Sequence, residues 1–353
     1  MAEKEKKNKG IDLPQTKGTF QIKGIVTGTE KDSFYKETLT KTTNKPFRRV
    51  NFGVKVDKES TLYIELSGME KDKVYFSKTT TTDGKRSTEV QDVPWKDRFK
   101  FNKEGYRLIG VNVGVTKTHD AKGNEVNDKK NLVEYDASKE IGENLKDDQS
   151  VFVKGNIDYS HFDSNNGGTK RAVKFIPSQV SLCKDVDFDA EDFVATADFT
   201  QVIVFTGITQ DENDKSRFIV SAKIVNYNGV EEAEFIITNK DLATLFKKNL
   251  KPYTSIKVWG NIVVEKDTVQ EEVSDSWGES NQMEKINSPT KRELVIVGAD
   301  PKTVDKETYT EDAIEQAIAK ANANKKAEND FGNNESWGSV SNSTRSSEED
   351  EAW

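Results

Sequence analysis

The chain has 353 residues, of which 33% are hydrophobic and 32% charged, and its formal net charge is −8. No hydrophobic run reaches the ~20 residues of a membrane-spanning helix, and we expect no secretory signal behind the charged N-terminus. With a single cysteine, Cys183, and two histidines, the sequence excludes an internal disulfide and disfavours a zinc site built on cysteine and histidine.

The charge is unevenly distributed along the chain. Residues 1–182 carry a net charge of +7, residues 183–300 carry −9 and residues 301–353 carry −6. Such asymmetry indicates that the segments meet different partners, and the positive segment is suited to a polyanion. Random variation of surface charge is the alternative explanation for the middle segment.

Short segments that alternate apolar and polar side chains predict β-strands in the first half of the chain. Residues 1–17 come first, rich in lysine and glutamate, and are expected to form a disordered arm. The predicted elements that follow are three strands, a short helix and two more strands, at 19–28, 47–57, 60–68, 135–145, 150–160 and 170–182.

The second half repeats this order with shorter connections. The segment "NLKDDQSVFVKGNI" at 144–157 returns as "NLKPYTSIKVWGNI" at 249–262, with eight identities in fourteen positions. Each copy also enters its last strand through the tripeptide Thr-Lys-Arg, at 169–171 and at 290–292. The predicted elements of the second copy are three strands, a helix and two strands, at 200–207, 217–227, 232–239, 240–250, 255–265 and 291–299.

Five strands with a helix between the third and the fourth are the chain order of the oligonucleotide/oligosaccharide-binding (OB) fold, a Greek-key barrel. The sequence therefore predicts a mainly β protein with two tandem OB-fold barrels, followed by a C-terminal helix and a disordered acidic tail. The predicted boundaries are a first barrel at 18–183 with a β-rich insertion at about 69–134, an acidic linker at 184–198, a second barrel at 199–300, a helical extension at 301–326 and the tail at 327–353.

The sequence carries no motif typical of catalysis. It lacks a phosphate-binding glycine-rich loop, a nucleophile elbow and the paired histidines of a zinc protease. Its many carboxylate pairs are expected by chance at this acidic content. We therefore expect a protein that is not an enzyme and that uses no cofactor or metal.

Single-stranded nucleic acid is held by cations that neutralise phosphates and by aromatic rings on which bases stack. The outward positions of the predicted strands supply both kinds of side chain in both copies. The alternative is that these are solvated charges and rings covered by neighbouring segments. The candidate residues on the strands are Arg49, Lys55, Tyr63, Phe152 and Lys154 in the first copy and Arg217, Lys223, Lys257 and Trp259 in the second.

The insertion adds a second group of candidates. Its segment 95–107 interleaves aromatic and basic residues, which favours a surface that stacks bases and follows phosphates. An ordinary β core whose lysines point to water is the alternative. The candidates are Trp95, Arg98, Phe99, Tyr106 and Arg107, and the loop before the last strand of the first copy adds Lys170 and Arg171.

The chain ends in "SSEEDEAW", which places four acids and an aromatic residue behind a segment rich in serine, asparagine and glycine. This end resembles the C-terminal tip of bacterial single-stranded DNA-binding proteins, whose acids and final aromatic ring dock on replication and repair partners. Family tips end in proline and phenylalanine, whereas this chain ends in Ala352-Trp353. A solubilising acidic tail is the alternative. The candidate partner-binding residues are Glu348, Glu349, Asp350, Glu351 and Trp353.

With the paired units that end in Gly155-Asn156-Ile157 and Gly260-Asn261-Ile262, the chain resembles large, two-barrel single-stranded DNA-binding proteins of bacteriophages. The resemblance implies sequence-independent binding to exposed strands in DNA replication, recombination or repair. It also implies a place in the host cytoplasm, no cofactor, and replication or recombination proteins as partners of the tip. The alternatives are an oligosaccharide-binding or virion structural protein, and an adaptor within a recombination complex.

Overall fold

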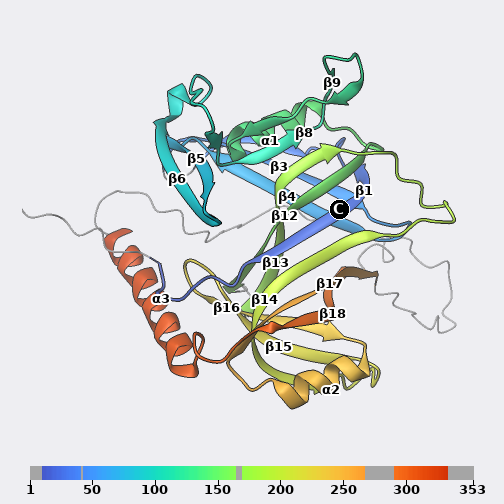
Figure 1. Ribbon diagram of the computed structural model, residues 1–353, viewed down its shortest axis with the longest axis vertical. Coiled ribbons are helices and arrows are strands. Elements are labelled where there is room, and N and C mark those ends of the chain that lie inside the picture. The colour runs from blue at the N-terminus through green and yellow to red at the C-terminus, as the bar shows by residue number, and fades with distance from the viewer. Residues whose placement is uncertain (1–9, 41–42, 164–168, 267–289, 333–353) are drawn as a thin grey trace, which may run out of the picture.

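The computed structural model describes residues 10–40, 43–163, 169–266 and 290–332. The protein is mainly β, as the sequence predicts, and its strands form two units that lie one above the other in Figure 1. No helix within these ranges is both long and apolar enough to cross a membrane.

The upper part in Figure 1, which we call unit 1, is a closed ring of five strands. Its elements are β1 (Gly18–Thr27), β3 (Pro46–Lys55), β4 (Thr61–Met69), α1 (Glu134–Asn144), β12 (Ser150–Asp163) and β13 (Thr169–Leu182). β1 pairs with β3, β3 with β4, β4 with β13, β13 with β12, and β12 returns to β1. The β4–β13 pairing is parallel and the others are antiparallel.

The lower part, unit 2, closes in the same order. Its elements are β14 (Thr196–Gln210), β15 (Phe218–Val225), β16 (Val230–Ile237), α2 (Lys240–Asn249), β17 (Thr254–Lys266) and β18 (Thr290–Asp305). β14 pairs with β15, β15 with β16, β16 with β18, β18 with β17, and β17 returns to β14. The parallel pairing again joins the third strand to the fifth.

The strands form where the sequence alternates apolar and polar residues. On β3, Val50, Phe52 and Val54 are at most 2% exposed, and Leu62 and Ile64 face them from β4. Burial of each such side chain contributes about 1.5–3 kcal/mol to folding. These residues belong to a hydrophobic core that runs through both units.

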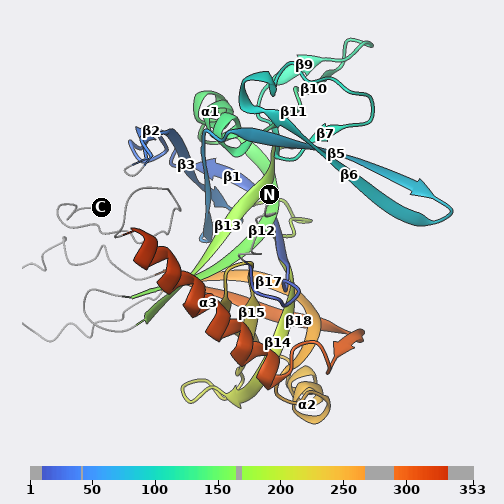
Figure 2. The same ribbon diagram turned by 90° about the vertical axis from the view of Figure 1, so that its left-hand side faces the viewer.

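The insertion of unit 1 builds a small domain of its own beside the ring. Strands β5 (Lys73–Thr82) and β6 (Lys85–Pro94) form a long hairpin that projects from the body in Figure 2. Its two-residue turn, Asp83-Gly84, has φ values of 52° and 74°, as a type I′ turn requires. The remaining elements of unit 1 are β2 (Tyr35–Leu39), the 3-10 helix η1 (Trp95–Asp97), β7 (Arg107–Leu108), β8 (Val111–Gly114), β9 (Lys117–His119), β10 (Glu125–Asn127) and β11 (Lys130–Leu132).

The two units are related by an internal pseudo-two-fold axis. β1 and β14 are equivalent strands, and they pair antiparallel so that Phe20 lies opposite Phe199. Phe20 also lies opposite Gly155 on β12, and Phe199 lies opposite Gly260 on β17. The repeated glycines thus take equivalent places on the two sides of the axis. The pairing joins the two rings into one sheet.

The repeated glycines lie on the fourth strand of each unit, opposite a bulge in the fifth strand. The register of β12 against β13 shifts between Lys154 and Gly155, and that of β17 against β18 shifts between Trp259 and Gly260. A Cβ on Gly155 would lie 2.0 Å from the carbonyl oxygen of Ile176. The bulge therefore brings two backbones closer together than any side chain allows, which is why glycine recurs in both copies.

Both ends of the described chain pack on unit 2, which corrects part of the expected disorder at 1–17. The amides of Ile11 and Thr16 donate to the carbonyl oxygens of Tyr227 and Val225. Helix α3 (Glu311–Gly332) lies alongside this segment and buries Ile314 against it. The helix also runs six residues into the expected tail, whereas residues 301–305 continue β18.

Candidate nucleic-acid interface

The outward faces of β3 and β4 in unit 1 carry a hollow beside an exposed aromatic ring. Gly53 lies opposite Tyr63, whose side chain is 55% exposed. The hollow has a volume of about 250 Å³ and is lined by this ring, by Lys55 and by Lys31 from the loop after β1. Among the described residues, no carboxylate forms an ion pair with either lysine. The arrangement gathers one flat ring and two available amines around a single depression.

Gly53 lines the hollow, and its neighbours leave no space for a side chain at this position. A Cβ at this position would approach the methyl groups of Thr27 and Thr61 to 2.8 Å. The two threonines lie on the neighbouring strands, so they flank the glycine on both sides. The two methyl groups occupy the place that a side chain would take, so this position of the sheet requires glycine.

The loop that carries Lys31 is held in place by one carboxylate. The backbone amides of Gly28 and Thr29 donate to Asp147, at 3.1 and 2.7 Å, and the Asp147 amide donates to the Thr29 hydroxyl at 3.0 Å. Partial burial acts to raise the pKa of Asp147, but the bonds from Thr29 and Gly28 outweigh it and the pKa is lowered. The ionised carboxylate therefore fastens this loop to the end of α1.

Replacement of Asp147 by asparagine is expected to lower the free energy of unfolding by about 1 kcal/mol at neutral pH, because the loop amides lose a charged acceptor. Since the folded pKa lies below the unfolded value of about 3.9, the contribution is present above that value and is lost as the pH falls through the folded pKa. Urea unfolding of the wild type and the variant at several pH values measures this contribution to the free energy of unfolding. The neighbouring D148N is the control, and an equal loss in both variants contradicts the anchoring role.

The equivalent face of unit 2 is acidic and is contacted by unit 1. The position of Tyr63 is taken there by Glu234, and the position of Thr61 by Glu232. Arg171 reaches across from β13 and bonds both glutamates, with Nη1 at 3.1 Å from Glu234. Lys223, the equivalent of Lys55, lies 3.7 Å from Glu232. Arg171, which was predicted to contact DNA, therefore joins the two units, whereas Lys223, also predicted to contact DNA, pairs within unit 2.

A neighbouring contact strengthens this closure. His161 Nδ1 lies 2.5 Å from a carboxylate oxygen of Glu231, and the Asn226 side chain donates to the Tyr159 carbonyl oxygen at 2.8 Å. Both contacts join the β12–β13 hairpin of unit 1 to β16 of unit 2 and to the turn before it. The hairpin therefore contacts this face of unit 2 at several points.

Arg49 and Arg217 are equivalent in sequence and have different surroundings. The Arg217 guanidinium donates to both oxygens of Glu293, at 2.6 and 2.5 Å, and Glu293 is only 6% exposed. Removal of one partner of such a pair leaves a buried charge. Arg217 thus stabilises unit 2, whereas Arg49 is half-buried on β3 and has no carboxylate partner among the residues described.

The candidates on the fourth strands share one face of the joined sheet. Strands β12, β1, β14 and β17 lie side by side, and their register aligns Thr19, Thr200 and Trp259 in one row. Lys154 lies in the next row, in line with Gln21 and Asp198. The residues of this face that were predicted to contact DNA are Phe152, which is half-buried, and Lys154, Lys257 and Trp259, which are exposed.

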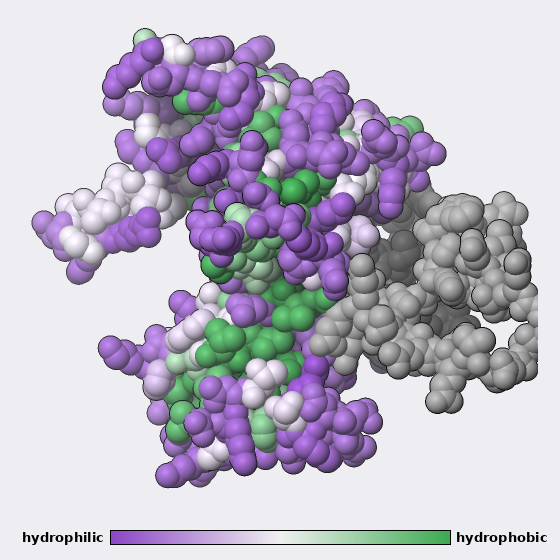
Figure 3. All heavy atoms as spheres, turned by 90° about the vertical axis from the view of Figure 1, so that its right-hand side faces the viewer, coloured by the Kyte–Doolittle hydropathy of each residue, from purple (hydrophilic) through white to green (hydrophobic). Residues whose placement is uncertain are grey.

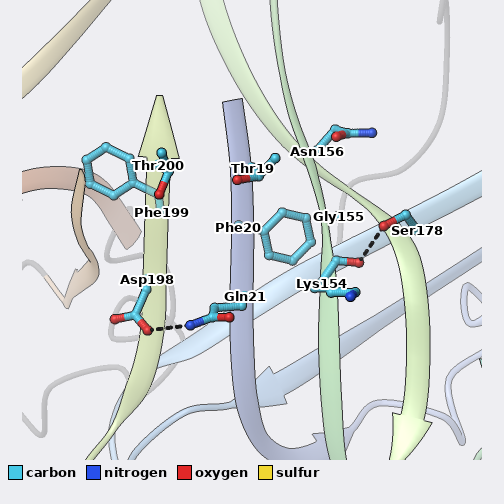
Figure 4. Close-up of a pocket in the computed structure, with 10 residues that line it drawn as sticks. All are labelled: Thr19, Phe20, Gln21, Lys154, Gly155, Asn156, Ser178, Asp198, Phe199 and Thr200. Atoms are coloured by element: carbon cyan, nitrogen blue, oxygen red, sulfur yellow. Dashed lines mark hydrogen bonds between the residues drawn. The ribbon is translucent and has the colours of Figure 1, made fainter. Parts of the chain in front are cut away.

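A second hollow, of about 410 Å³, opens on the joined sheet (Figure 4). The Gln21 amide donates to the Asp198 carboxylate across it at 3.1 Å. A negative charge in the middle of this face makes it less suited to a polyanion than the hollow of unit 1. Over the face of the molecule in Figure 3, hydrophobic residues gather on unit 2 and at its boundary, and unit 1 is mostly hydrophilic.

In the insertion, the alternative of an ordinary β core describes most of the rings. Trp95 packs on Tyr135 at 5.8 Å, and Tyr106 packs on Phe101 at 6.1 Å. These rings belong to a small core with Phe76, so Trp95 and Tyr106 stabilise the insertion. Both rings are half-buried in this arrangement.

The remaining candidates of the insertion differ in whether they pair with a neighbour or are exposed to solvent. Arg98 donates to both oxygens of Asp136, at 2.7 and 3.1 Å, and lies 4.1 Å above the Trp95 ring. Asp136, which lies in the first turn of helix α1, therefore pairs with Arg98. Phe99, 67% exposed, and Arg107 remain open to solvent.

Some predicted residues lie outside the described part of the structure. They are the side chain of Lys170 and the tail residues Glu348, Glu349, Asp350, Glu351 and Trp353. Two residues of the unit 1 hollow were missed, Lys31 and Gly53. The available signal was that Lys31 follows the first strand, where loops of a barrel end converge, and that Gly53 interrupts the outward side chains of its strand.

The chain belongs to the YorF family, whose model matches residues 81–334. Among solved structures, it is similar to the wild-type single-stranded DNA binding protein from Thermus aquaticus, with a TM-score of 0.37 and 12% identity over 81% of this chain and 93% of that chain. A deletion mutant of that protein, which also carries an arginine-to-alanine substitution, gives a TM-score of 0.37 and 11% identity over 81% and 94% of the two chains. No curated protein sequence matches the chain.

Proposed function

We propose that this member of the YorF family binds single-stranded DNA without sequence preference, through the outward face of β3 and β4 in unit 1. The observation that carries the proposal is the hollow over Gly53, where the exposed Tyr63 ring lies beside Lys31 and Lys55. Each unit closes five strands in the order of an OB-fold barrel, whose second and third strands are the face that binds oligonucleotides.

The chemistry of the hollow favours unpaired strands over duplex. A base that stacks on the Tyr63 ring must be free of its partner, and stacking contributes ~1–3 kcal/mol per base. The amines neutralise phosphates and release counterions, which contributes affinity at any sequence. Binding through ring faces and phosphates leaves the hydrogen-bonding edges of the bases unread, so sequence preference should be weak.

In this proposal the two units have different roles, which follow from their charge. Unit 1 lies in the part of the chain with a net charge of +7 and supplies the main contact. Unit 2 lies in the part with −9 and serves as a scaffold that holds unit 1 through Arg171. The proposal includes no catalytic step and no cofactor.

The end of the chain adds a recruiting role to the proposal. The residues from Glu348 to Trp353 combine acids with a final aromatic ring, which suits a basic pocket with an apolar centre on a replication or recombination protein. Protection of exposed strands and delivery of such a partner would then reside in one chain.

Titration of a fluorescent ~30-nucleotide single strand with the full chain is expected to give saturable binding, tighter than to duplex of the same length. The affinity should fall steeply between about 50 and about 200 mM salt, because counterions are released on binding. Strands of different sequence should bind alike. Binding that ignores salt would support an oligosaccharide or apolar ligand instead, and no binding at either salt concentration would leave an adaptor.

A further inference from the structure

The fourth and fifth strands of each unit reach beyond their own ring toward the other unit. In unit 1 this extension brings Arg171 against the outward face of unit 2, where it bonds Glu234 and Glu232. The internal pseudo-two-fold axis predicts the converse contact, from the end of β18 to the outward face of unit 1. Arg292 occupies that end, and like Arg171 it closes the tripeptide with which the last strand begins.

The pseudo-two-fold axis places the end of β18, which carries Arg292, on the side of Tyr63 across the two units. In agreement with this placement, the Tyr63 phenol acts to raise the pKa of the Arg292 guanidinium. Tyr63 stands where unit 2 has Glu234, so the same strand position receives an arginine in both units. The two arginines lie on the same side of their strands, two positions apart in register.

Arg292 combines exposure to solvent with close protein surroundings. Its side chain is exposed to solvent, yet protein surrounds it closely enough that desolvation lowers the pKa of the guanidinium, and the phenol of Tyr63 opposes this only in part. Arg171 has two carboxylate partners. Arg292 has none among the described residues. Its charge is therefore available to an anion that enters the space between the units.

We propose that Arg292 of unit 2 completes the DNA site of unit 1 by binding a backbone phosphate next to the base stacked on Tyr63. This inference rests on the proposed function and extends it, because it places the bound strand in the space between the units. An arginine suits the role, since its planar fork of donors matches two phosphate oxygens. The strand does not continue over the equivalent face of unit 2, where Arg171 and the glutamates already meet.

The chain supplies a matched pair of variants. R292Q and R171Q each remove one positive charge from the same kind of extension, so any general effect of net charge is common to both. With a fluorescent ~30-nucleotide strand, R292Q is expected to weaken binding about tenfold at low salt. It should also reduce the slope of log affinity against log salt by about 0.7, as the loss of one phosphate contact does for single strands. R171Q should change the slope little.

The outcomes separate the two proposals. If Y63A weakens binding and R292Q does not, the unit 1 site stands and the role of Arg292 is wrong. If neither variant changes a binding that persists, both proposals are wrong. R292K distinguishes a phosphate contact from a purely structural one, because it keeps the charge and should retain the salt slope. Thermal unfolding of each variant checks that the units remain folded, and unfolding of R292Q alone would count against a ligand role.

Discussion

Replacement of Gly155 by alanine is expected to lower the free energy of unfolding by about 3 kcal/mol or more, an effect at the upper end of those caused by overpacking. The added Cβ would lie 2.0 Å from the Ile176 carbonyl oxygen and 2.7 Å from the Pro177 Cα. Both atoms belong to the backbone of β13, so no side-chain rotation relieves the collision. Urea unfolding followed by circular dichroism measures the loss.

The second copy and an open glycine provide the comparisons. G260A should be destabilised to a similar degree, because its Cβ would lie 1.8 Å from the Val295 carbonyl oxygen. G207A, which lies beside the bulge of β14, has no atom within 4 Å of the added Cβ and should change stability by less than about 1 kcal/mol. Equal stability of all three variants would show that the strands are not packed as described.

The double variant K55E/Y63A is expected to weaken single-strand binding about 100-fold at low salt. Loss of the ring removes ~1–3 kcal/mol of stacking, and reversal of the neighbouring charge repels phosphate. Together the two effects approach the ~2.7 kcal/mol that corresponds to a 100-fold change in affinity. Fluorescence anisotropy across a salt series measures both the affinity and its slope. The slope of log affinity against log salt should become shallower as well.

K223E in unit 2 is the matched control, because Lys223 is the equivalent of Lys55 but pairs with Glu232. It should alter affinity less than about threefold, a small effect next to loss of a direct contact. Unfolding measurements on both variants exclude a collapse of either unit. Equal losses in the two units would overturn the assignment of the site to unit 1.

Much of the fold could be predicted because its signals are local. The alternation through Val50, Phe52 and Val54 marks a strand with one buried side, and the structure confirms it. The repeat around Gly155 and Gly260 identified two copies of one unit, and the strand pairings close both copies in the same order. The antiparallel pairing of β1 with β14 has no comparable signal in the sequence, because the edge of either strand could have faced water.

The residues that could not be assigned from sequence are those decided by a distant partner. Arg98 finds its carboxylate 38 positions away, and Arg171 finds Glu232 61 positions away. From the sequence alone, a cation exposed at the surface cannot be distinguished from a cation in an internal ion pair. Residues 10–17 illustrate the same limit, because their backbone bonds to Val225 and Tyr227 depend on the second unit and leave no periodic pattern.

The union of β1 and β14 within one polypeptide has a consequence for how such a protein can change. In an assembly of identical subunits, a substitution appears at every symmetric position. An acid that strengthens a contact between subunits on one surface would therefore also repel an anionic ligand from the equivalent surface. Here the two copies vary independently, and Tyr63 could persist where its counterpart became Glu234. Under the proposed function, the duplicated chain can therefore assign binding to unit 1 and support to unit 2.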